Sequence, residues 1–159
     1  MAQRSTLALL AGLVLTACNQ PFEPTRRGST LPTRPGLTLA ATDSAVVLAA
    51  GDIAGCSSTY RDKQTAALLD RWPEATVFTV GDNAYPDGSA AQWACYDASW
   101  GRAKARTFFA MGNHDYNTAG ATPAFDYANG VGVDSGRAGH RLRGYYAMDL
   151  ANWRIIVLN

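Results

Sequence analysis

The sequence predicts an α/β fold built around a parallel sheet. Short apolar segments typical of buried strands alternate along the chain with segments that have the spacing of amphipathic helices. Three of the strand segments, residues 45–50, 76–80 and 107–111, are each followed by a glycine and then by a polar side chain. Because the carboxyl ends of parallel strands meet at one edge of a sheet, where ligands bind, these polar residues are expected to lie close together.

Two predicted helices join the strands. Residues 61–72 have apolar positions at helical spacing, and Pro73 ends this helix. Residues 89–106 have a second apolar face, which is weakest at Gly101. The alternating order favours right-handed crossovers, and the uninterrupted apolar run 45–50 predicts a strand covered on both faces. The apolar positions are Thr65, Leu68, Leu69 and Trp72 in the first helix and Trp93, Tyr96 and Trp100 in the second.

The last third of the chain is predicted to contain a long loop and a hairpin. Residues 123–144 are rich in glycine and have one possible helical turn, near 125–129. A loop of this length in a compact domain is typically functional or poorly ordered. Residues 144–150 and 153–158 have strand composition, and the two residues between them are enough for a tight turn.

Residues 1–17 have the features of an export signal. Residues 7–15 are apolar but too short to span a bilayer. The segment Leu15-Thr16-Ala17-Cys18 resembles a bacterial lipoprotein signal, which implies cleavage before Cys18 and a lipid on its thiol. The alternative is an ordinary secretory signal with a chance cysteine. Both predict export; the lipoprotein signal also predicts anchoring to a bacterial membrane, in the periplasm or at the cell surface.

The remaining sequence divides into a linker and a domain. Residues 18–40 form a proline-rich tether, and residues 41–159 form the folded domain. The apolar content of 47% and charged content of 17% are ordinary for a globular protein. A net charge of +1 without a long basic run predicts no nucleic-acid-binding surface.

The cysteines predict one disulfide. If Cys18 carries lipid, only Cys56 and Cys95 remain, and a single cysteine pair in an exported protein is typically bridged. The bridge would tie the first two polar loops together. The alternative is a pair of unpaired buried thiols.

The polar loops carry residue types suited to metal and phosphate chemistry. Carboxylates on two strand ends, Asp52 and Asp82, are what a two-metal site needs, and Asn113 would add a neutral oxygen ligand. His114 lies beside Asp115, which suggests an imidazole that a carboxylate orients for general acid catalysis.

These loops resemble the first three motifs of the calcineurin-like metallophosphoesterases, and the tyrosine of the second motif is similar to that of the purple acid phosphatase branch. The resemblance covers roughly residues 45–159 and implies a β-sandwich flanked by helices, of which this chain has the first half. The motifs are Gly51-Asp52, Gly81-Asp82-Asn83-Ala84-Tyr85 and Gly112-Asn113-His114-Asp115.

The resemblance implies two metal ions, iron with zinc, manganese or a second iron. Asp52 and Tyr85 would hold the first ion, Asp82 would bridge both, and Asn113 would hold the second. Many family members have a histidine ligand in the first motif where this chain has Ala54, so Tyr85 is expected to replace it.

The resemblance also implies the reaction. A metal-bridging hydroxide would attack the phosphorus of a phosphoric monoester, as in acid phosphatases, in a small molecule or a phosphoprotein. His114 would protonate the leaving alcohol, and Asp115 would orient His114.

The chain departs from the family pattern in one respect that bears on the expected activity. The family places a lone histidine and a Gly-His-x-His motif further on, whereas this chain ends at Asn159. We therefore expect a fragment that turns over poorly unless a C-terminal half or a partner chain completes the site. The alternatives are a non-catalytic exported lipoprotein that keeps the first half of the fold, and a single-metal site used for sequestration.

Overall fold

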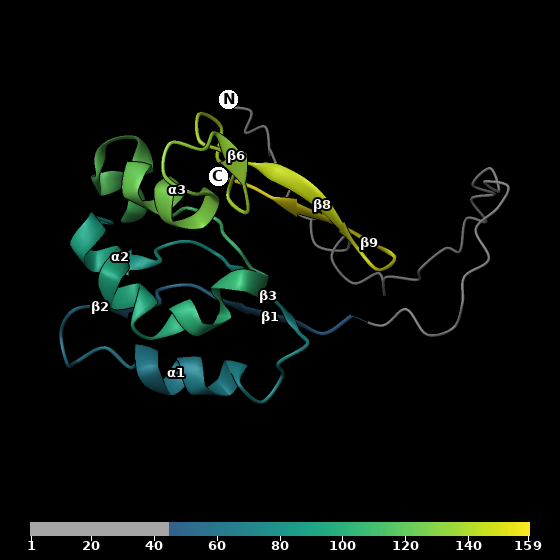
Figure 1. Cartoon of the computed structure of the whole chain (residues 1–159), viewed down its shortest axis with the longest axis horizontal. Helices are drawn as coiled ribbons and strands as arrows, with labels where there is room; N and C mark the ends of the chain where they lie inside the picture. The colour runs from purple at the N-terminus through teal and green to yellow at the C-terminus, as the bar shows by residue number, and fades with distance from the viewer. Residues whose placement is uncertain (1–44) are drawn as a thin grey trace, which may run out of the picture. The chain divides into compact units, whose positions relative to one another are not determined.

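The computed structural model describes residues 45–159, which form a mixed α/β unit (Figure 1). The predicted signal 1–17, Cys18 and the linker 18–40 lie outside the described residues. Among residues 45–159, no helix has the length and apolar character needed to cross a bilayer.

The central sheet is parallel, as the sequence predicts. It contains β1 (Val47–Ala50), β3 (Thr76–Thr79) and β5 (Thr107–Phe108), in the order β1-β3-β5. The strand at β5 is shorter than the predicted 107–111. Beyond it, the N–H of Phe109 donates to the carbonyl of Arg137 at 2.8 Å, and that of Ala110 donates to the carbonyl of Thr79 at 3.2 Å.

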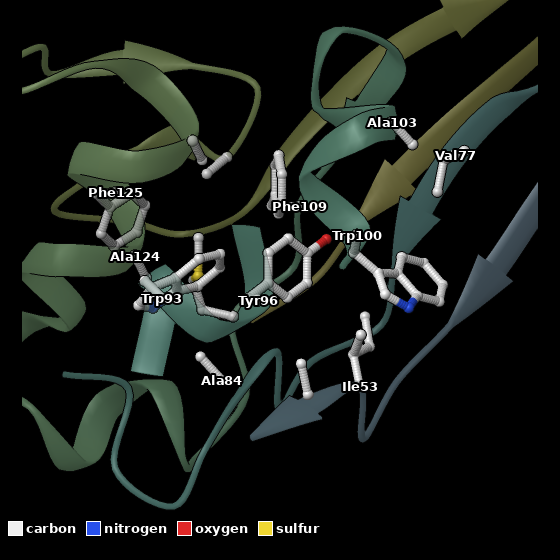
Figure 2. Close-up of a cluster of buried hydrophobic side chains, with 14 of the residues drawn as sticks. Ile53, Val77, Ala84, Trp93, Tyr96, Trp100, Ala103, Phe109, Ala124 and Phe125 are labelled. Carbon is white, nitrogen blue, oxygen red and sulfur yellow. The ribbon is translucent and has the colours of Figure 1, made fainter. Parts of the chain in front are cut away.

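The helices pack on one face of this sheet. The largest buried cluster joins Val77 of β3 to residues of all three α-helices, and Figure 2 shows its aromatic centre. Three aromatic side chains of the second predicted helix face this cluster and are at most 3% exposed, which confirms the predicted apolar face. They are Trp93, Tyr96 and Trp100.

The first helix, α1 (Asp62–Leu69), presents a different face from the predicted one. Asp62, Ala66 and Leu69 are its buried residues, whereas Leu68 and Trp72, two of the predicted apolar positions, are 52% and 48% exposed. The end of the helix is held by Arg106, whose guanidinium donates to the carbonyls at 69, 72 and 75. These bonds tie the end of α1 and the segment that follows it to Arg106 at the end of η1.

The second predicted helix is divided into two. It consists of α2 (Ala90–Asp97) and the 3-10 helix η1 (Trp100–Arg106). A Cβ atom at Gly101 would lie 2.3 Å from the Asp97 carboxylate, so a larger residue there would require the Asp97 side chain to move.

The helical turn predicted near 125–129 is confirmed and is longer than expected. It is α3 (Thr122–Asn129), which begins with a proline in its first turn and buries Ala124, Phe125 and Ala128. Residues 130–144 are mostly loop, as predicted. A short antiparallel pair follows, β6 (Ser135–Gly136) and β7 (Gly139–His140). Two 3-10 turns precede α3: η2 (Asp115–Asn117) and η3 (Ala119–Ala121).

The predicted hairpin is confirmed and covers the other face of the sheet. It is formed by β8 (Tyr146–Leu150) and β9 (Trp153–Val157), drawn in yellow in Figure 1. Ala151 in the turn has φ 49°. The hairpin packs on Phe78 and Phe108, in a second buried cluster.

The first strand is less covered than its apolar sequence predicts. Val47 is 44% exposed and Val80, just beyond β3, is 66% exposed. Both line an apolar groove of about 400 Å³ between the sheet and β9. The hairpin therefore covers β3 and β5 better than β1, which lies at the edge of the sheet.

Candidate metal centre

The centre of the site is a matched break in two neighbouring strands. Beyond β1 and β3 the chain resumes pairing as β2 (Ala54–Gly55) and β4 (Ala84–Tyr85), again in parallel. Residues 51–53 separate β1 from β2, whereas residues 80–83 separate β3 from β4. The β3–β4 connection therefore has one extra residue. A bulge of this kind re-aims side chains at the edge of a sheet.

Asp52 and Asp82 occupy this break in the same backbone conformation. Their φ angles are 53° and 51°, in the left-handed region that costs a non-glycine residue about 1–3 kcal/mol when it is held there. Backbone hydrogen bonds hold the two segments side by side: the N–H of Asp52 donates to Gly81 at 3.3 Å, and that of Ile53 donates to Asp82 at 3.0 Å. The paired conformation brings both carboxylates to the same side.

The two carboxylates meet at one phenol. The hydroxyl of Tyr85 lies within hydrogen-bonding distance of Asp52 Oδ1 and of Asp82 Oδ2, the latter at 3.1 Å. A phenol has a single hydrogen, so it can donate fully to only one of them. Three oxygen atoms thus converge with one proton among them. The hydrogen bond to Asp52, burial and the nearby Asp82 raise the pKa of Tyr85 above its ordinary value.

Close backbone packing fixes the Asp82 carboxylate. Its Oδ1 accepts a hydrogen bond from the backbone N–H of His114, at 2.9 Å. A Cβ atom on Gly112 would lie 2.2 Å from both the N and the Oδ1 of Asp82, so the third loop can approach only because residue 112 is glycine. Gly81, with φ 104°, supplies the turn before Asp82.

The imidazole of His114 lies against the phenol of Tyr85, with ring centroids 4.3 Å apart. Its Nδ1 is 2.7 Å from the carbonyl oxygen of Pro86. A carbonyl only accepts hydrogen bonds, so Nδ1 carries the hydrogen and Nε2 is the nitrogen available for proton transfer.

Asp115 has a different role from the predicted one. It is fully buried, and its carboxylate accepts hydrogen bonds from the N–H and side-chain amide of Asn83 and from the N–H groups of Ala84 and Gly112. The carboxylate is thus bonded to the second and third loops, and the orienting of His114 falls to the Pro86 carbonyl. Burial raises the pKa of Asp115, and the N–H donors oppose that rise. The expectation that Asp115 orients His114 is therefore wrong.

Asn113 is placed on the same loop but outside this cluster. The residue is exposed, and its side chain makes no hydrogen bond within residues 45–159. The structure therefore brings Asp52, Asp82 and Tyr85 into direct contact, with His114 beside them, and no hydrogen bond joins the Asn113 amide to them.

The donor set fits one hard cation. Two carboxylates and a phenol offer oxygen ligands of the kind that hard divalent and trivalent ions prefer. The described part of the chain has no group of three or more histidine, cysteine, aspartate or glutamate side chains able to hold a metal ion. The Tyr85 oxygen is therefore needed to complete a three-ligand set, and a second ion would have only Asp82 and Asn113.

The predicted disulfide is confirmed and supports the first loop. Cys56 and Cys95 are bridged, with Cα atoms 5.3 Å apart, which attaches the segment after β2 to α2.

Sequence reasoning missed three parts of the site. These are the Pro86 carbonyl, the one-residue bulge and the buried amide of Asn83, which donates to Asp115 and, at 2.8 Å, to the carbonyl of Ala110. The first two are backbone features with no residue signature. Asn83 had a signal, because it is a polar residue between two loop residues already assigned to the site.

No protein-family model matches this chain, and no curated protein or solved structure matches it.

Proposed function

We propose that the protein hydrolyses phosphoric esters with the help of bound metal ions, as a phosphomonoesterase of the calcineurin-like metallophosphoesterase type. The observation that carries this proposal is the convergence of Asp52 and Asp82 on the Tyr85 hydroxyl, beside an imidazole with a free Nε2. An oxygen-rich cation site next to a proton donor suits attack on a phosphoryl group.

The contacts of Asp52, Asp82, Tyr85 and His114 support their roles, whereas the role of Asn113 rests on the family resemblance alone. Asp52, Asp82 and Tyr85 would hold the first ion, iron in the resembling branch, and Asp82 with Asn113 would hold a second ion of zinc, manganese or iron. When bound, the ions would polarise the phosphoryl oxygens and supply a nucleophile at neutral pH. His114 would donate a proton from Nε2 to the leaving alcohol. The Pro86 carbonyl accepts a hydrogen bond from Nδ1–H, so Nε2 has a proton to donate only in the doubly protonated imidazolium, which is the form that this transfer requires.

The arrangement of layers is compatible with the sandwich that this family implies. Helices lie on one face of the parallel sheet and the β8–β9 hairpin on the other. Export and attachment through a lipid on Cys18 belong to the same proposal, and they rest on the amino-terminal sequence alone.

The test is hydrolysis of p-nitrophenyl phosphate by the purified full chain, without added metal and with Mn²⁺ or iron. We expect activity that requires the metal and is abolished by Asp82→Asn. Asp149→Asn, on the exposed hairpin, is the matched control and should keep the activity. Absence of hydrolysis at every metal loading would contradict the proposal.

A second candidate is a site that binds one cation without catalysis. It is favoured by the exposure of Asn113, whose amide forms no hydrogen bond with Asp82. Binding of one ion per chain with no hydrolysis would support this candidate, whereas two ions with turnover would support the phosphomonoesterase.

A further inference from the structure

The turn at the end of β4 carries two parts of the site at once. Tyr85 supplies the phenol of the metal centre, and the carbonyl of the next residue, Pro86, accepts a hydrogen bond from His114 Nδ1. The N–H of Gly88 donates to the carbonyl of Ala84 at 2.9 Å, which closes the turn. A change in the direction of the Pro86 carbonyl would therefore change the orientation of the imidazole.

Two side chains at the end of η2 donate to the carbonyls of this turn. The amide Nδ2 of Asn117 lies 3.3 Å from the Pro86 oxygen, the same atom that accepts from His114. The hydroxyl of Thr118 donates to the next carbonyl, that of Asp87, at 2.7 Å. A carbonyl oxygen has two lone pairs, so Pro86 can accept from Asn117 and His114 together. Two consecutive carbonyls of the turn are thus held by two consecutive side chains.

The hydroxyl of Thr118 is not used in the way that its position favours. Thr118 is the N-cap residue of η3, with φ −89° and ψ 128°. A threonine at an N-cap commonly accepts a hydrogen bond from an N–H of the following helix, yet this side chain makes no capping bond. Its hydroxyl instead donates to Asp87, 31 residues away in sequence. The hydroxyl therefore ties the turn at the end of β4 to the segment that carries His114.

The hydrogen bond between His114 and Pro86 is open to water. Pro86 is exposed and His114 is half-buried. Because water competes for a carbonyl at the surface, the net contribution of such a bond is small, and the bond depends on both partners being held in place. The His114 side is held through its backbone N–H, which donates to Asp82 Oδ1 at 2.9 Å. The Pro86 side is held by Asn117 and, through the next peptide, by Thr118.

We propose that Asn117 and Thr118 are positioning residues for His114. By fixing the carbonyls of Pro86 and Asp87, they keep the Nδ1 hydrogen of the imidazole on Pro86 and leave Nε2 as the nitrogen that exchanges a proton with the leaving alcohol. The part of this inference that concerns the reaction rests on the proposed function, whereas the effect on the imidazole rests on the contacts alone.

The state of the imidazole can be measured without turnover. The chain has two histidines, and their contacts give them opposite neutral tautomers. His114 has its hydrogen on Nδ1, whereas Nδ1 of His140 accepts from the N–H of Leu142 at 3.2 Å, so His140 has its hydrogen on Nε2. The measurement is a ring ¹⁵N NMR spectrum of the full chain without added metal, at a pH where both rings are neutral. In Thr118→Val the ratio of Nδ1–H to Nε2–H in His114 should fall at least about twofold, and His140 should not change.

Matched variants isolate the two donors. Thr118→Ser keeps the hydroxyl and should restore the wild-type ratio. Thr122→Val removes a hydroxyl that donates to the carbonyl of Ala119, away from the turn, and should change neither ring. Asn117→Ala, at an exposed residue, should move the His114 ratio in the same direction as Thr118→Val, and it decides the matter if Thr118→Val does not fold. A His114 ratio that stays at the wild-type value in both Thr118→Val and Asn117→Ala would overturn the inference.

Hydrolysis separates this inference from the proposed function. The p-nitrophenolate ion leaves without a proton, whereas the alcohol of ethyl phosphate needs one. With Mn²⁺ added, Thr118→Val should lower kcat for ethyl phosphate about tenfold or more and kcat for p-nitrophenyl phosphate much less, and Thr118→Ser should restore both. An equal loss for the two esters, as a general loss of folded protein would give, overturns the inference and leaves the phosphomonoesterase. A shift of the His114 ratio in a chain whose wild type hydrolyses neither ester overturns the phosphomonoesterase and, with it, the role of the two residues in the reaction.

Discussion

Asp52 and Asp82 break two neighbouring parallel strands with nearly the same φ, 53° and 51°, and both carboxylates reach the hydroxyl of Tyr85. Holding two aspartates in this backbone conformation lowers the stability of the fold, and strain of this kind concentrates at functional sites. The one-residue bulge on the Asp82 side sets the offset that brings the two side chains together.

A substitution at Gly112 tests whether the close approach of the third loop to Asp82 holds the Asp82 carboxylate in place. Gly112→Ala places a methyl group 2.2 Å from Asp82 N and Oδ1, so the carboxylate must move. We expect a loss of about 1–3 kcal/mol in the free energy of unfolding and weaker Mn²⁺ binding. The measurements are urea denaturation and calorimetric titration.

The control for Gly112→Ala is Gly132→Ala, at a position with φ 71° and no atom within 4 Å of the added Cβ. It adds backbone strain without a collision near Asp82, and should leave Mn²⁺ binding intact. Unchanged Mn²⁺ binding by Gly112→Ala would show that the close approach does not fix Asp82.

Asp115 is predicted to act through the backbone. Asp115→Ala leaves buried N–H groups of Asn83, Ala84 and Gly112 without their acceptor. The expected destabilisation is about 3 kcal/mol, measured by urea denaturation. Asp134→Asn, at an exposed carboxylate, should cost less than about 0.5 kcal/mol. A loss for Asp115→Ala no larger than this control would contradict the assigned role.

The disulfide should contribute substantially to stability. Cys56 and Cys95 are 39 residues apart in sequence, and a closed loop of that length is worth about 4 kcal/mol in the chain-entropy model. The Cys56→Ser, Cys95→Ser double variant should therefore unfold at a clearly lower temperature. Dithiothreitol should lower the unfolding temperature of the wild type and not that of the double variant; equal sensitivity would argue against a native bridge.

Asp126 should contribute to the loss of stability in acid. The N–H of Gly132 and the guanidinium of Arg141 lower the pKa of Asp126 below its ordinary value. Its stabilising effect is therefore complete above the pKa of an unfolded aspartate, about 3.9, and is lost as the pH falls through the lowered folded value. Asp126→Asn should flatten the decline of unfolding free energy in that acid range.

Arg141→Gln is the matched variant for Asp126, because it removes the guanidinium and keeps the hydrogen bond from Gly132. It should reduce the acid dependence only in part. An Asp126→Asn chain with the same acid dependence as the wild type would contradict this account.

The central sheet and the aromatic face of α2 and η1 could be predicted because each depends on a local pattern. Strands followed by glycine and aspartate, and aromatic residues at 93, 96 and 100, are visible in the sequence alone. The burial of α1 could not be predicted in the same way. Which face of α1 is buried depends on segments that are distant in sequence, among them Arg106, which bonds to the carbonyls of Leu69 and Ala75.

The candidate site was predictable in its residue types and only partly in its contacts. Two carboxylates and a tyrosine at adjacent strand ends indicated an oxygen-rich centre. The partner of His114 could not be read from the sequence, because the neighbouring Asp115 suggested a pair whereas the Pro86 carbonyl makes the contact. Backbone acceptors carry no sequence signal, so this assignment needed the fold.

The most direct test of the account is calorimetric titration of Mn²⁺ into the full chain and into Asp52→Asn, Asp82→Asn and Asp149→Asn. If Asp52 and Asp82 share one cation, each of the first two variants should bind Mn²⁺ at least about tenfold more weakly than the wild type, and Asp149→Asn should bind it equally well. Equal affinity in all four proteins, or no binding by the wild type, would contradict the account.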